Sequence, residues 1–259
     1  MSDTVLVEVR GEVAVVTLNR PDTANTLDLA MGRELLAAAL RCEADPAVRA
    51  VVLTGAGKAF CFGGDLRGMM GGEVPIEPYL KELTTHLHAA VARLMRMDAP
   101  VVAAVNGTAA GAGVGLVAMA DLAVMAAGAK ISLAYTGVGL TPDGGTSFLL
   151  PRAVGTKRAM ELVLTNRALT APEALEWGLV NQVVPDAEVL EKALELAGRL
   201  AAGPKGAFGR SKRLIAASLG ALESQLSLES ETSAAQAATV EGRECIGAFF
   251  EKRKAQYPR

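Results

Sequence analysis

Backbone N–H groups in two glycine-rich segments, together with one isolated carboxylate, are the reactive groups that this sequence offers first. The segment Lys58–Asp65 (KAFCFGGD) contains paired glycines, which leave backbone N–H groups open to a ligand. The segment Asn106–Gly115 (NGTAAGAGVG) lies where a strand is expected to run into a helix, and the free N–H groups at a helix start stabilise negative charge. Two such loops can form a two-donor oxyanion hole, which stabilises the charge that develops on a carbonyl oxygen.

The isolated carboxylate is Asp143, which lies among glycines and apolar residues in the segment Gly137–Ser147. The local pattern fits two roles equally: an N-cap for a helix that begins near Gly144, or an acid or base that points into a pocket. Cys61 lies beside the first glycine loop, but the sequence identifies no base for it. We therefore expect a buried and unreactive thiol at Cys61.

The sequence gives no support for a redox cofactor or a metal. Gly113–Ala118 fits the GxGxxA pattern of dinucleotide-binding folds, but the following strand, Leu122–Ala126, ends without the acid that would bind ribose. The three cysteines are far apart and form no CxxC pair, so neither a zinc site nor a disulfide framework is expected.

The composition excludes several kinds of partner. Among 259 residues, 26 Lys and Arg nearly balance 28 Asp and Glu, and aromatic residues make up 4%. Nucleic-acid-binding proteins usually carry a basic stripe and aromatic stacking platforms, so we expect no nucleic-acid partner. The uncharged run Val101–Ala120 contains Asn106 and four glycines, which indicates a buried strand, turn and helix rather than a membrane span. The N-terminus lacks a basic targeting segment, and a cytoplasmic protein is expected.

The elements that must hold the glycine loops alternate between strands and helices up to Gly144, and helices dominate beyond it. This pattern predicts an α/β core followed by a helical C-terminal region. Strands are expected at Val5–Arg10, Val13–Asn19, Ala50–Thr54, Val101–Val105, Leu122–Ala126 and Ile131–Leu133. Helices are expected at Asp28–Glu43, Pro75–Met97, Gly111–Ala120, Glu188–Ala202, Lys205–Leu219, Ala221–Val240 and Glu241–Lys254, and Thr170–Glu173 forms a capping box.

Six segments, in the same order, resemble elements of the crotonase superfamily of enoyl-CoA hydratases and isomerases. They are Arg20–Leu27 (RPDTANTL), Ala59–Asp65, Val105–Asp121, Gly139–Arg152 (GLTPDGGTSFLLPR), Ala171–Pro185 and Glu241–Arg253. The resemblance implies an α/β crotonase-like spiral of ββα turns, in which residues 1–200 form the core with its acyl-CoA site. It also implies that residues 201–259 form a helical region for oligomerisation and for closing the pocket, in a homotrimer or homohexamer. The PDGG form of the fourth segment most resembles the enoyl-CoA isomerase and epoxyphenylacetyl-CoA isomerase branch.

The resemblance also assigns site residues by position. The two oxyanion donors would be the N–H groups of Gly64 and Ala112. The backbone that meets the CoA nucleotide would be that of Asp22, Thr23 and Ala24. The other expected substrate-binding residues are Gly63, Asp65, Leu66, Gly111, Gly113 and Tyr135.

The chain departs from the superfamily's hydratases at the two positions that matter most for adding water. Those enzymes use two glutamates, and the matching positions here are Gly115 and Tyr135. Isomerases of the superfamily carry an acid at the position of Asp143. The resemblance therefore implies an enoyl-CoA isomerase that moves a 3-enoyl double bond to the 2-position, with Asp143 as the sole proton carrier. Tyr135 is expected to shape the pocket rather than to form a hydrogen bond in it.

Other readings stay open at this stage. Asp143 could attack the substrate covalently, as the acid does in the superfamily's aryl-CoA dehalogenases, which also use a histidine. The two candidate histidines, His86 and His88, are two residues apart, so they should face different ways on a helix. The dehalogenase pocket also carries a Trp, whereas Trp177 lies in a later helix, and both histidines are expected outside the reacting centre. Hydration, thioester hydrolysis, isomerisation of a carrier-protein thioester and non-catalytic thioester binding are the remaining alternatives.

Overall fold

The computed structural model describes residues 3–71, 76–138 and 140–217, together with positions 240, 244, 251, 253 and 256. The helices expected over 221–240 and 241–254 lie outside the described residues apart from those isolated positions, and so does most of the expected oligomerisation and pocket-closing region. The boundary expected after residue 200 stays a prediction.

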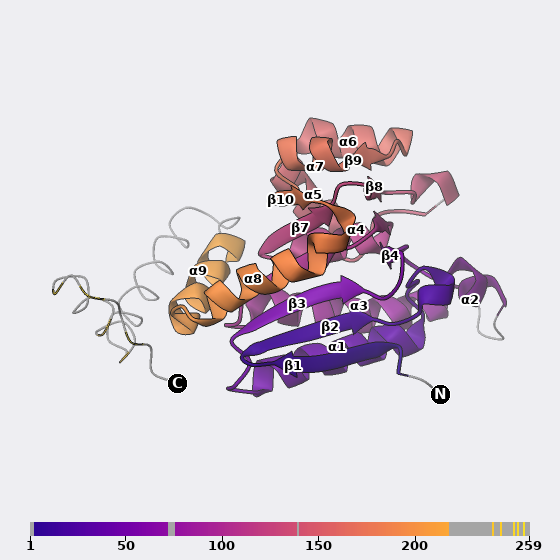
Figure 1. Cartoon of the computed structure of the whole chain (residues 1–259). Coiled ribbons are helices and arrows are strands. Elements are labelled where there is room, and N and C mark those ends of the chain that lie inside the picture. The colour runs from indigo at the N-terminus through magenta and orange to yellow at the C-terminus, as the bar shows by residue number, and fades with distance from the viewer. Residues whose placement is uncertain are drawn as a thin grey trace.

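A six-stranded sheet forms the centre of the molecule, in the order β1-β2-β3-β5-β7-β10 (Figure 1). β1 (Val5–Arg10) and β2 (Val13–Leu18) form the expected antiparallel hairpin, and every other neighbouring pair is parallel. The inner strands β3 (Ala50–Gly55), β5 (Val101–Val105) and β7 (Leu122–Ala126) are almost entirely buried. Such continuous apolar runs are typical of parallel strands that are covered on both faces.

Helices supply that cover. α8 (Val189–Ala201) crosses one face of the sheet. Its buried alanines recur every four residues, at Ala193, Ala197 and Ala201, and so lie on one side of the helix. Their small side chains let α8 approach β3, β5 and β7 closely. α1 (Leu29–Ala44) and α3 (Ile76–Arg96) pack against each other on the opposite face (Figure 1).

A second, smaller sheet has the order β4-β6-β8-β9. Its strands are β4 (Ala59–Cys61), β6 (Thr108–Ala110), β8 (Lys130–Ser132) and β9 (Leu169–Thr170), and only β9 is antiparallel to its neighbour. β3, β5 and β7 are each followed by a short strand of this sheet and then by a helix. These repeated strand–strand–helix units confirm the expected spiral, and they bring the segments after β4, β6 and β8 to one side of the small sheet.

The remaining helices of the described ranges are short. They are α2 (Leu66–Gly71), α4 (Ala112–Met119), α5 (Thr146–Val154), α6 (Thr156–Thr165), α7 (Ala171–Glu176) and α9 (Lys205–Ala217), with 3₁₀ turns at Pro21–Thr23, Thr136–Val138 and Asp186–Glu188. The capping box expected at Thr170 and Glu173 starts α7. None of the helices in these ranges is both long and apolar enough to cross a bilayer.

Helices dominate after Gly144, as expected, but two strands that the sequence did not predict also lie there. β10 (Gln182–Val184) completes the large sheet beside β7, and β9 completes the small sheet. The strands β4 and β6 were also not expected. All four have two or three residues, so they are too short to show the alternation or the apolar run by which strands are recognised.

Candidate active site

The three chemistry-bearing segments of the sequence meet at one place. A Cβ atom on Gly63 would lie 2.9 Å from the Ala110 carbonyl oxygen and 3.0 Å from the Ala112 nitrogen. A Cβ atom on Gly144 would lie 3.4 Å from that of Ala112. The missing side chains therefore let the first glycine loop, the start of α4 and the segment that carries Asp143 come into backbone contact. Gly63 also has a φ of +78°, which glycine adopts without strain.

The two expected oxyanion donors have N–H groups that are free to bind a ligand. The Leu27 N–H donates to the Gly63 carbonyl at 2.7 Å, and the Asp65 N–H donates to the Leu27 carbonyl at 2.9 Å, which fixes Gly64 between them. Ala112 is the first residue of α4, where helical N–H groups have no partner within the helix. Among the described residues, neither the Gly64 nor the Ala112 N–H has an acceptor. The arrangement can therefore stabilise an oxyanion.

Asp143 does not cap a helix, so the structural alternative for this residue is wrong. α5 begins at Thr146 after Gly145, and no side chain caps it; the Thr146 N–H donates instead to the Asp143 backbone carbonyl at 2.9 Å. Asp143 lines a cavity of about 750 Å³. Burial raises the pKa of Asp143, against the lowering influence of the Tyr135 hydroxyl and of His88.

Tyr135 takes part in the site in a way that the sequence did not predict. Its hydroxyl donates to Asp143 Oδ1 at 2.8 Å, so the expectation that Tyr135 only shapes the pocket is wrong. The position that would hold a hydratase glutamate is therefore occupied by a donor directed at Asp143, the one carboxylate among the described residues that line the cavity.

The two histidines face different ways, as the two-residue spacing predicted. His86 packs toward α1. A Cβ atom on Gly32 of that helix would lie 3.6 Å from the Cβ atom of His86. His88 lines the Asp143 cavity, and its Nε2 accepts the Gly144 N–H at 3.1 Å. His88 thus lies beside Asp143 and supports the backbone next to it. No local pattern marks this contact, because 56 residues separate the two partners.

At Gly115 the structure leaves no room for a side chain. A Cβ atom there would lie 2.4 Å from the Gly144 carbonyl oxygen and 2.9 Å from Thr146 Oγ1. The segment that carries Asp143 therefore occupies the space into which a glutamate at position 115 would project.

The Asp143 cavity extends along α3. Its walls come from three parts of the chain. They are His88, Val91, Ala92, Met95 and Arg96 of α3, then Pro142, Asp143, Gly145, Ser147 and Phe148, and finally Arg213, Leu214 and Ala216 of α9. Most of the side chains between Asp143 and the α9 end are apolar, which suits an acyl group.

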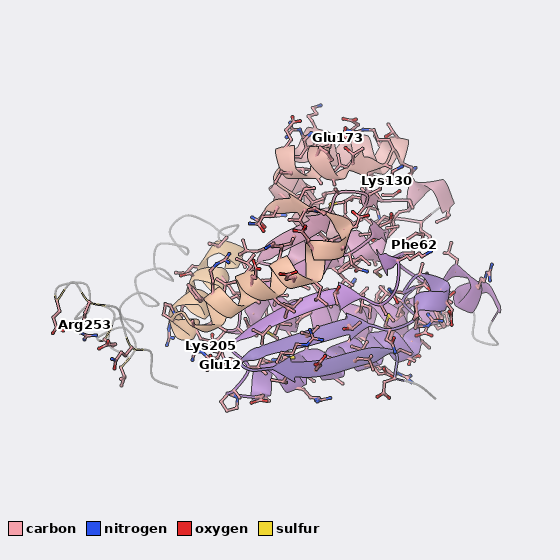
Figure 2. All side chains as sticks on the ribbon, viewed as in Figure 1. Glu12, Phe62, Lys130, Glu173, Lys205 and Arg253 are labelled. Carbon is pink, nitrogen blue, oxygen red and sulfur yellow. The ribbon has the colours of Figure 1, made fainter. Side chains whose placement is uncertain are left out.

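A second cavity, of about 380 Å³, brings together much of the expected CoA-binding set. Asp22, Thr23, Gly64, Asp65 and Leu66 line it, with Thr26, Phe62 and Arg67. Phe62 lies at the end of β4 and is 46% exposed (Figure 2). Ala24 does not line this cavity, but its carbonyl accepts the Phe62 N–H at 3.1 Å and so joins the two loops. Asp65 is engaged in an ion pair with Arg20 at 3.0 Å, which holds the same loops together.

Cys61, Gly111 and Gly113 lie beneath the site rather than in a cavity. Cys61 is fully buried, and burial raises the pKa of its thiol to about 12, which agrees with an unreactive role. The Gly111 N–H donates to the Ser132 carbonyl at 3.0 Å, and a Cβ on Gly113 would lie 2.2 Å from the Cys61 carbonyl oxygen. Both glycines allow the start of α4 to lie close to the neighbouring backbone of the small sheet. Within the described ranges, no three His, Cys, Asp or Glu side chains gather as a metal site requires.

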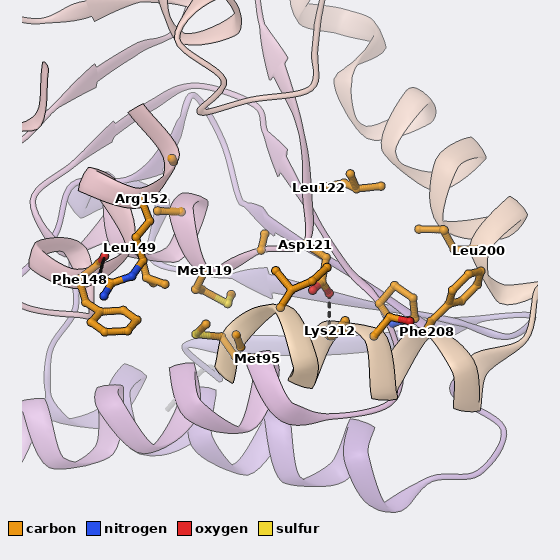
Figure 3. Close-up of a pocket in the computed structure, with 17 residues that line it drawn as sticks. Met95, Met119, Asp121, Leu122, Phe148, Leu149, Arg152, Leu200, Phe208 and Lys212 are labelled. Carbon is orange, nitrogen blue, oxygen red and sulfur yellow. Dashed lines mark hydrogen bonds and ion pairs between the residues drawn. The ribbon is translucent and has the colours of Figure 1, made fainter. Parts of the chain in front are cut away.

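A third cavity, of about 620 Å³, lies between α4, α5 and α9 (Figure 3). It shares Met95, Phe148 and Ala216 with the Asp143 cavity but contains none of the expected site residues. Its polar feature is the ion pair between Lys212 and Asp121, at 2.6 Å, which ties α9 to the start of β7 (Figure 3).

Comparison with known proteins agrees with this geometry. The family model described as enoyl-CoA hydratase/isomerase matches residues 8–259. The chain is 36% identical over 259 residues to the 1,2-epoxyphenylacetyl-CoA isomerase of Escherichia coli (strain K12), covering 99% of both chains. It is 40% identical over 204 residues to 4-chlorobenzoyl coenzyme A dehalogenase-2 of an Arthrobacter species, covering 78% of this chain and 74% of the relative. The crystal structure of an enoyl-CoA hydratase from Polaromonas sp. JS666 superposes with a TM-score of 0.92 at 33% identity, covering 98% of this chain and 99% of the other.

Proposed function

The chain belongs to the enoyl-CoA hydratase/isomerase family, and we propose that within this family it is an enoyl-thioester isomerase that moves a 3-enoyl double bond to the conjugated 2-position. The observation that carries the proposal is the single carboxylate, Asp143, in a largely apolar cavity whose loop contacts the start of α4. The family relationship supports an acyl-CoA as the substrate, and a carrier-protein thioester shares the same reactive group.

The proposed reaction needs one base and one oxyanion site. The thioester carbonyl accepts hydrogen bonds from the N–H groups of Gly64 and Ala112, which makes the C2 hydrogens more acidic. Asp143 removes a C2 proton, and the two N–H groups stabilise the negative charge of the resulting dienolate. The protonated Asp143 then returns the proton to C4 as the electrons move to the C2–C3 bond, so that the carboxylate is regenerated. Since the proton moves between two carbons and Asp143, the reaction requires neither a metal nor a redox cofactor.

Burial prepares Asp143 for this task. A carboxylate with a raised pKa is a stronger proton acceptor than an exposed aspartate, and it remains a competent acid once protonated. The apolar walls formed by Val91, Ala92 and Met95 also keep water away from the dienolate.

Hydration fits the site less well. Adding water to an alkene requires groups that position the water and move its protons. The backbone contact at Gly115 leaves no space for one hydratase carboxylate. Tyr135 stands at the other position, and burial raises its pKa far above neutral, so its hydroxyl is a poor proton carrier.

The test is to incubate the protein with 3-hexenoyl-CoA and, separately, with crotonyl-CoA, and to follow conjugated enoyl thioester by ultraviolet absorbance and products by mass spectrometry. We expect 3-hexenoyl-CoA to be converted to 2-hexenoyl-CoA and crotonyl-CoA to gain no water. Rapid hydration of crotonyl-CoA without isomerisation would contradict the proposal. No turnover of either substrate, with tight thioester binding, would favour a non-catalytic binder.

A second candidate, hydrolytic dehalogenation of an aryl thioester, is favoured by the position of His88 beside Asp143 and by the dehalogenase relative. In that reaction Asp143 would displace halide from the ring, and water would then hydrolyse the aryl ester. The water needs a base, but the His88 Nε2 lone pair accepts the Gly144 N–H. For this reason we rank isomerisation first. Chloride release from 4-chlorobenzoyl-CoA, at a rate above that of 3-hexenoyl-CoA isomerisation, would reverse the order.

A further inference from the structure

Tyr135 presents its hydroxyl group to one particular oxygen of Asp143. The distance from Tyr135 Oη to Asp143 Oδ1 is 2.8 Å, and the tyrosine is 7% exposed. Thr146 Oγ1 lies 3.4 Å from the same hydroxyl. Because the single proton of the tyrosine goes to Asp143, the threonine hydroxyl must be the donor to the tyrosine. The three groups form a chain of hydrogen bonds that ends at the carboxylate, and such chains strengthen each member.

The backbone fixes the tyrosine in this position. The Tyr135 N–H donates to the Leu133 carbonyl at 2.7 Å, and the Tyr135 carbonyl accepts the N–H groups of Val138 and Leu140. The preceding residue, Ala134, has a φ of +56°, a left-handed conformation that is uncommon for a residue with a side chain. A strained residue directly before a buried hydroxyl is typical of a functional constraint.

The other carboxylate oxygen of Asp143 is free. Oδ2 accepts no hydrogen bond from any other described residue, and it is not among the buried oxygens, so it keeps accessible surface in a residue that lines the cavity. The two oxygens therefore differ in their surroundings: Oδ1 is held by Tyr135, and Oδ2 is open.

We propose that Tyr135 is a positioning residue that holds Asp143 through Oδ1, so that Oδ2 alone accepts and returns the substrate proton. This inference rests on the proposed isomerase function for its chemical consequence, but not for its structural content. A hydrogen bond to Oδ1 stabilises the carboxylate more than the protonated acid, so it lowers the pKa of Asp143 and opposes the effect of burial. It also removes the side-chain rotation that would carry Oδ2 away from the substrate.

The charged and polar groups that face Asp143 are few. His88 approaches from α3, Thr146 stands behind Tyr135 at the start of α5, and no other ionisable described residue lines the cavity except Arg96 and Arg213 at its α9 end. Tyr135 is the only one of these side chains with a hydrogen bond to the carboxyl, so its removal has a defined effect on the Asp143 titration.

The experiment measures the Asp143 titration directly. Protein labelled with [4-¹³C]aspartate is titrated by NMR, and the Asp143 resonance is assigned by its loss in Asp143→Asn. We expect the pKa of Asp143 to rise by about one unit in Tyr135→Phe, the size expected for losing a hydrogen bond to a charged group. The acid limb of kcat/KM for 3-hexenoyl-CoA should move to higher pH by the same amount, while kcat falls about tenfold at its plateau and KM stays within about twofold.

Tyr79→Phe is the matched control, because it removes the hydroxyl of another buried tyrosine that does not contact Asp143. It should leave the Asp143 titration unchanged. A second measurement avoids mutation by replacing tyrosine with 3-fluorotyrosine, whose hydroxyl is a stronger hydrogen-bond donor. The pKa of Asp143 should then fall in the otherwise unaltered chain. It should not fall when 3-fluorotyrosine is incorporated into Tyr135→Phe.

The outcomes separate this inference from the proposed function. An unchanged Asp143 titration in folded Tyr135→Phe, or in the fluorotyrosine protein, would overturn the positioning role whatever the enzyme catalyses. A shifted titration in a protein that does not isomerise 3-hexenoyl-CoA would support the positioning role and contradict the isomerase.

Discussion

The Asp143 carboxyl is partly buried, and burying a charged group lowers the free energy of unfolding. The unfolded chain titrates this group near its ordinary pKa of about 3.9, and the folded chain at a higher pH. Between these two values the folded state holds the proton more tightly. The stability contributed by Asp143 is therefore fully present below about pH 3.9 and is lost as the pH rises through the folded pKa.

Asp143→Asn should consequently stabilise the protein at neutral pH, by about 0.5–2 kcal/mol, the range usual for relieving an active-site group. The asparagine is neutral, and its oxygen can still accept the Tyr135 hydroxyl proton. Urea unfolding at pH 7 and near pH 4 checks the prediction, because the gain should shrink at the lower pH. The control is Asp186→Asn, which changes a surface carboxylate that accepts the Gly128 N–H. This variant should not gain stability at neutral pH. A neutral-pH loss of stability in Asp143→Asn would contradict this account of Asp143.

At the residue scale the glycine loops and the lone carboxylate left local signals, and the structure brings these segments together. The family resemblance chose Gly64 and Ala112 as the two N–H donors, and their role stays a prediction. The sequence did not predict the partners of the carboxylate. Tyr135 and His88 meet the Asp143 segment only through the fold, and neither spacing nor periodicity marks them. The N-cap alternative for Asp143 was also a local inference, and the actual start of α5 at Thr146 overturned it.

At the scale of single elements, α4 and the Asp143 segment are in contact because Gly115 has no side chain. Gly115→Ala should destabilise the protein by about 1–3 kcal/mol, as overpacking does, and should lower isomerase activity by displacing Gly144. Thermal unfolding and steady-state kinetics measure the two effects. Gly198→Ala in α8 is the matched control: its Cβ would meet nothing within 4 Å, so the same change there should be neutral or stabilising. Equal effects at both glycines would contradict the steric account.

α9 depends on the ion pair between Lys212 and Asp121. Lys212 also donates to the carbonyls of Leu94 and Ala99, and Asp121 accepts the Val101 N–H at 2.7 Å, so the pair links α9 to both α3 and the large sheet. Lys212→Met removes the cation from Asp121, whose side chain is 25% exposed, and leaves the carbonyls of Leu94 and Ala99 without this donor. We expect this variant to lose about 1–3 kcal/mol in urea unfolding, and the double variant with Asp121→Asn to lose less than the sum of the two single losses. Additive losses would show that the two side chains do not interact.

The elements that sequence reasoning missed are the short ones. The long apolar strands and amphipathic helices were predicted within a few residues, because burial on both faces of a parallel sheet and on one face of a helix leaves strong patterns. β4 and β6 have three residues each and run directly into glycine loops, so their strand character arises only from pairing with each other and with β8.

At the scale of the whole molecule, the two sheets explain why the site forms where it does. Each spiral turn passes from a buried strand of the large sheet to a short strand of the small one, and the segments that follow β4, β6 and β8 carry Gly64, Ala112 and Asp143 in turn. The resemblance in six motifs predicted this architecture. No local rule would have paired β10 with β7, because the pairing joins residues 58 positions apart.

The resemblance also predicts that the chain assembles as a trimer or as a pair of trimers. Sedimentation equilibrium of the purified protein should therefore give the mass of three or six chains. A monomer that is fully active at assay concentration would contradict the expected assembly.

If Asp143 alone carries the proton, the isomerisation of 3-hexenoyl-CoA should depend on it, and Asp143→Asn measured beside the wild-type protein tests this. We expect kcat to fall by about 10²–10⁴-fold, the usual contribution of a general acid–base group, while the dissociation constant for 2-hexenoyl-CoA stays within a few-fold. Asp186→Asn should retain wild-type activity. An Asp143→Asn enzyme that isomerises within tenfold of the wild-type rate would contradict the claim and would require a proton carrier other than Asp143.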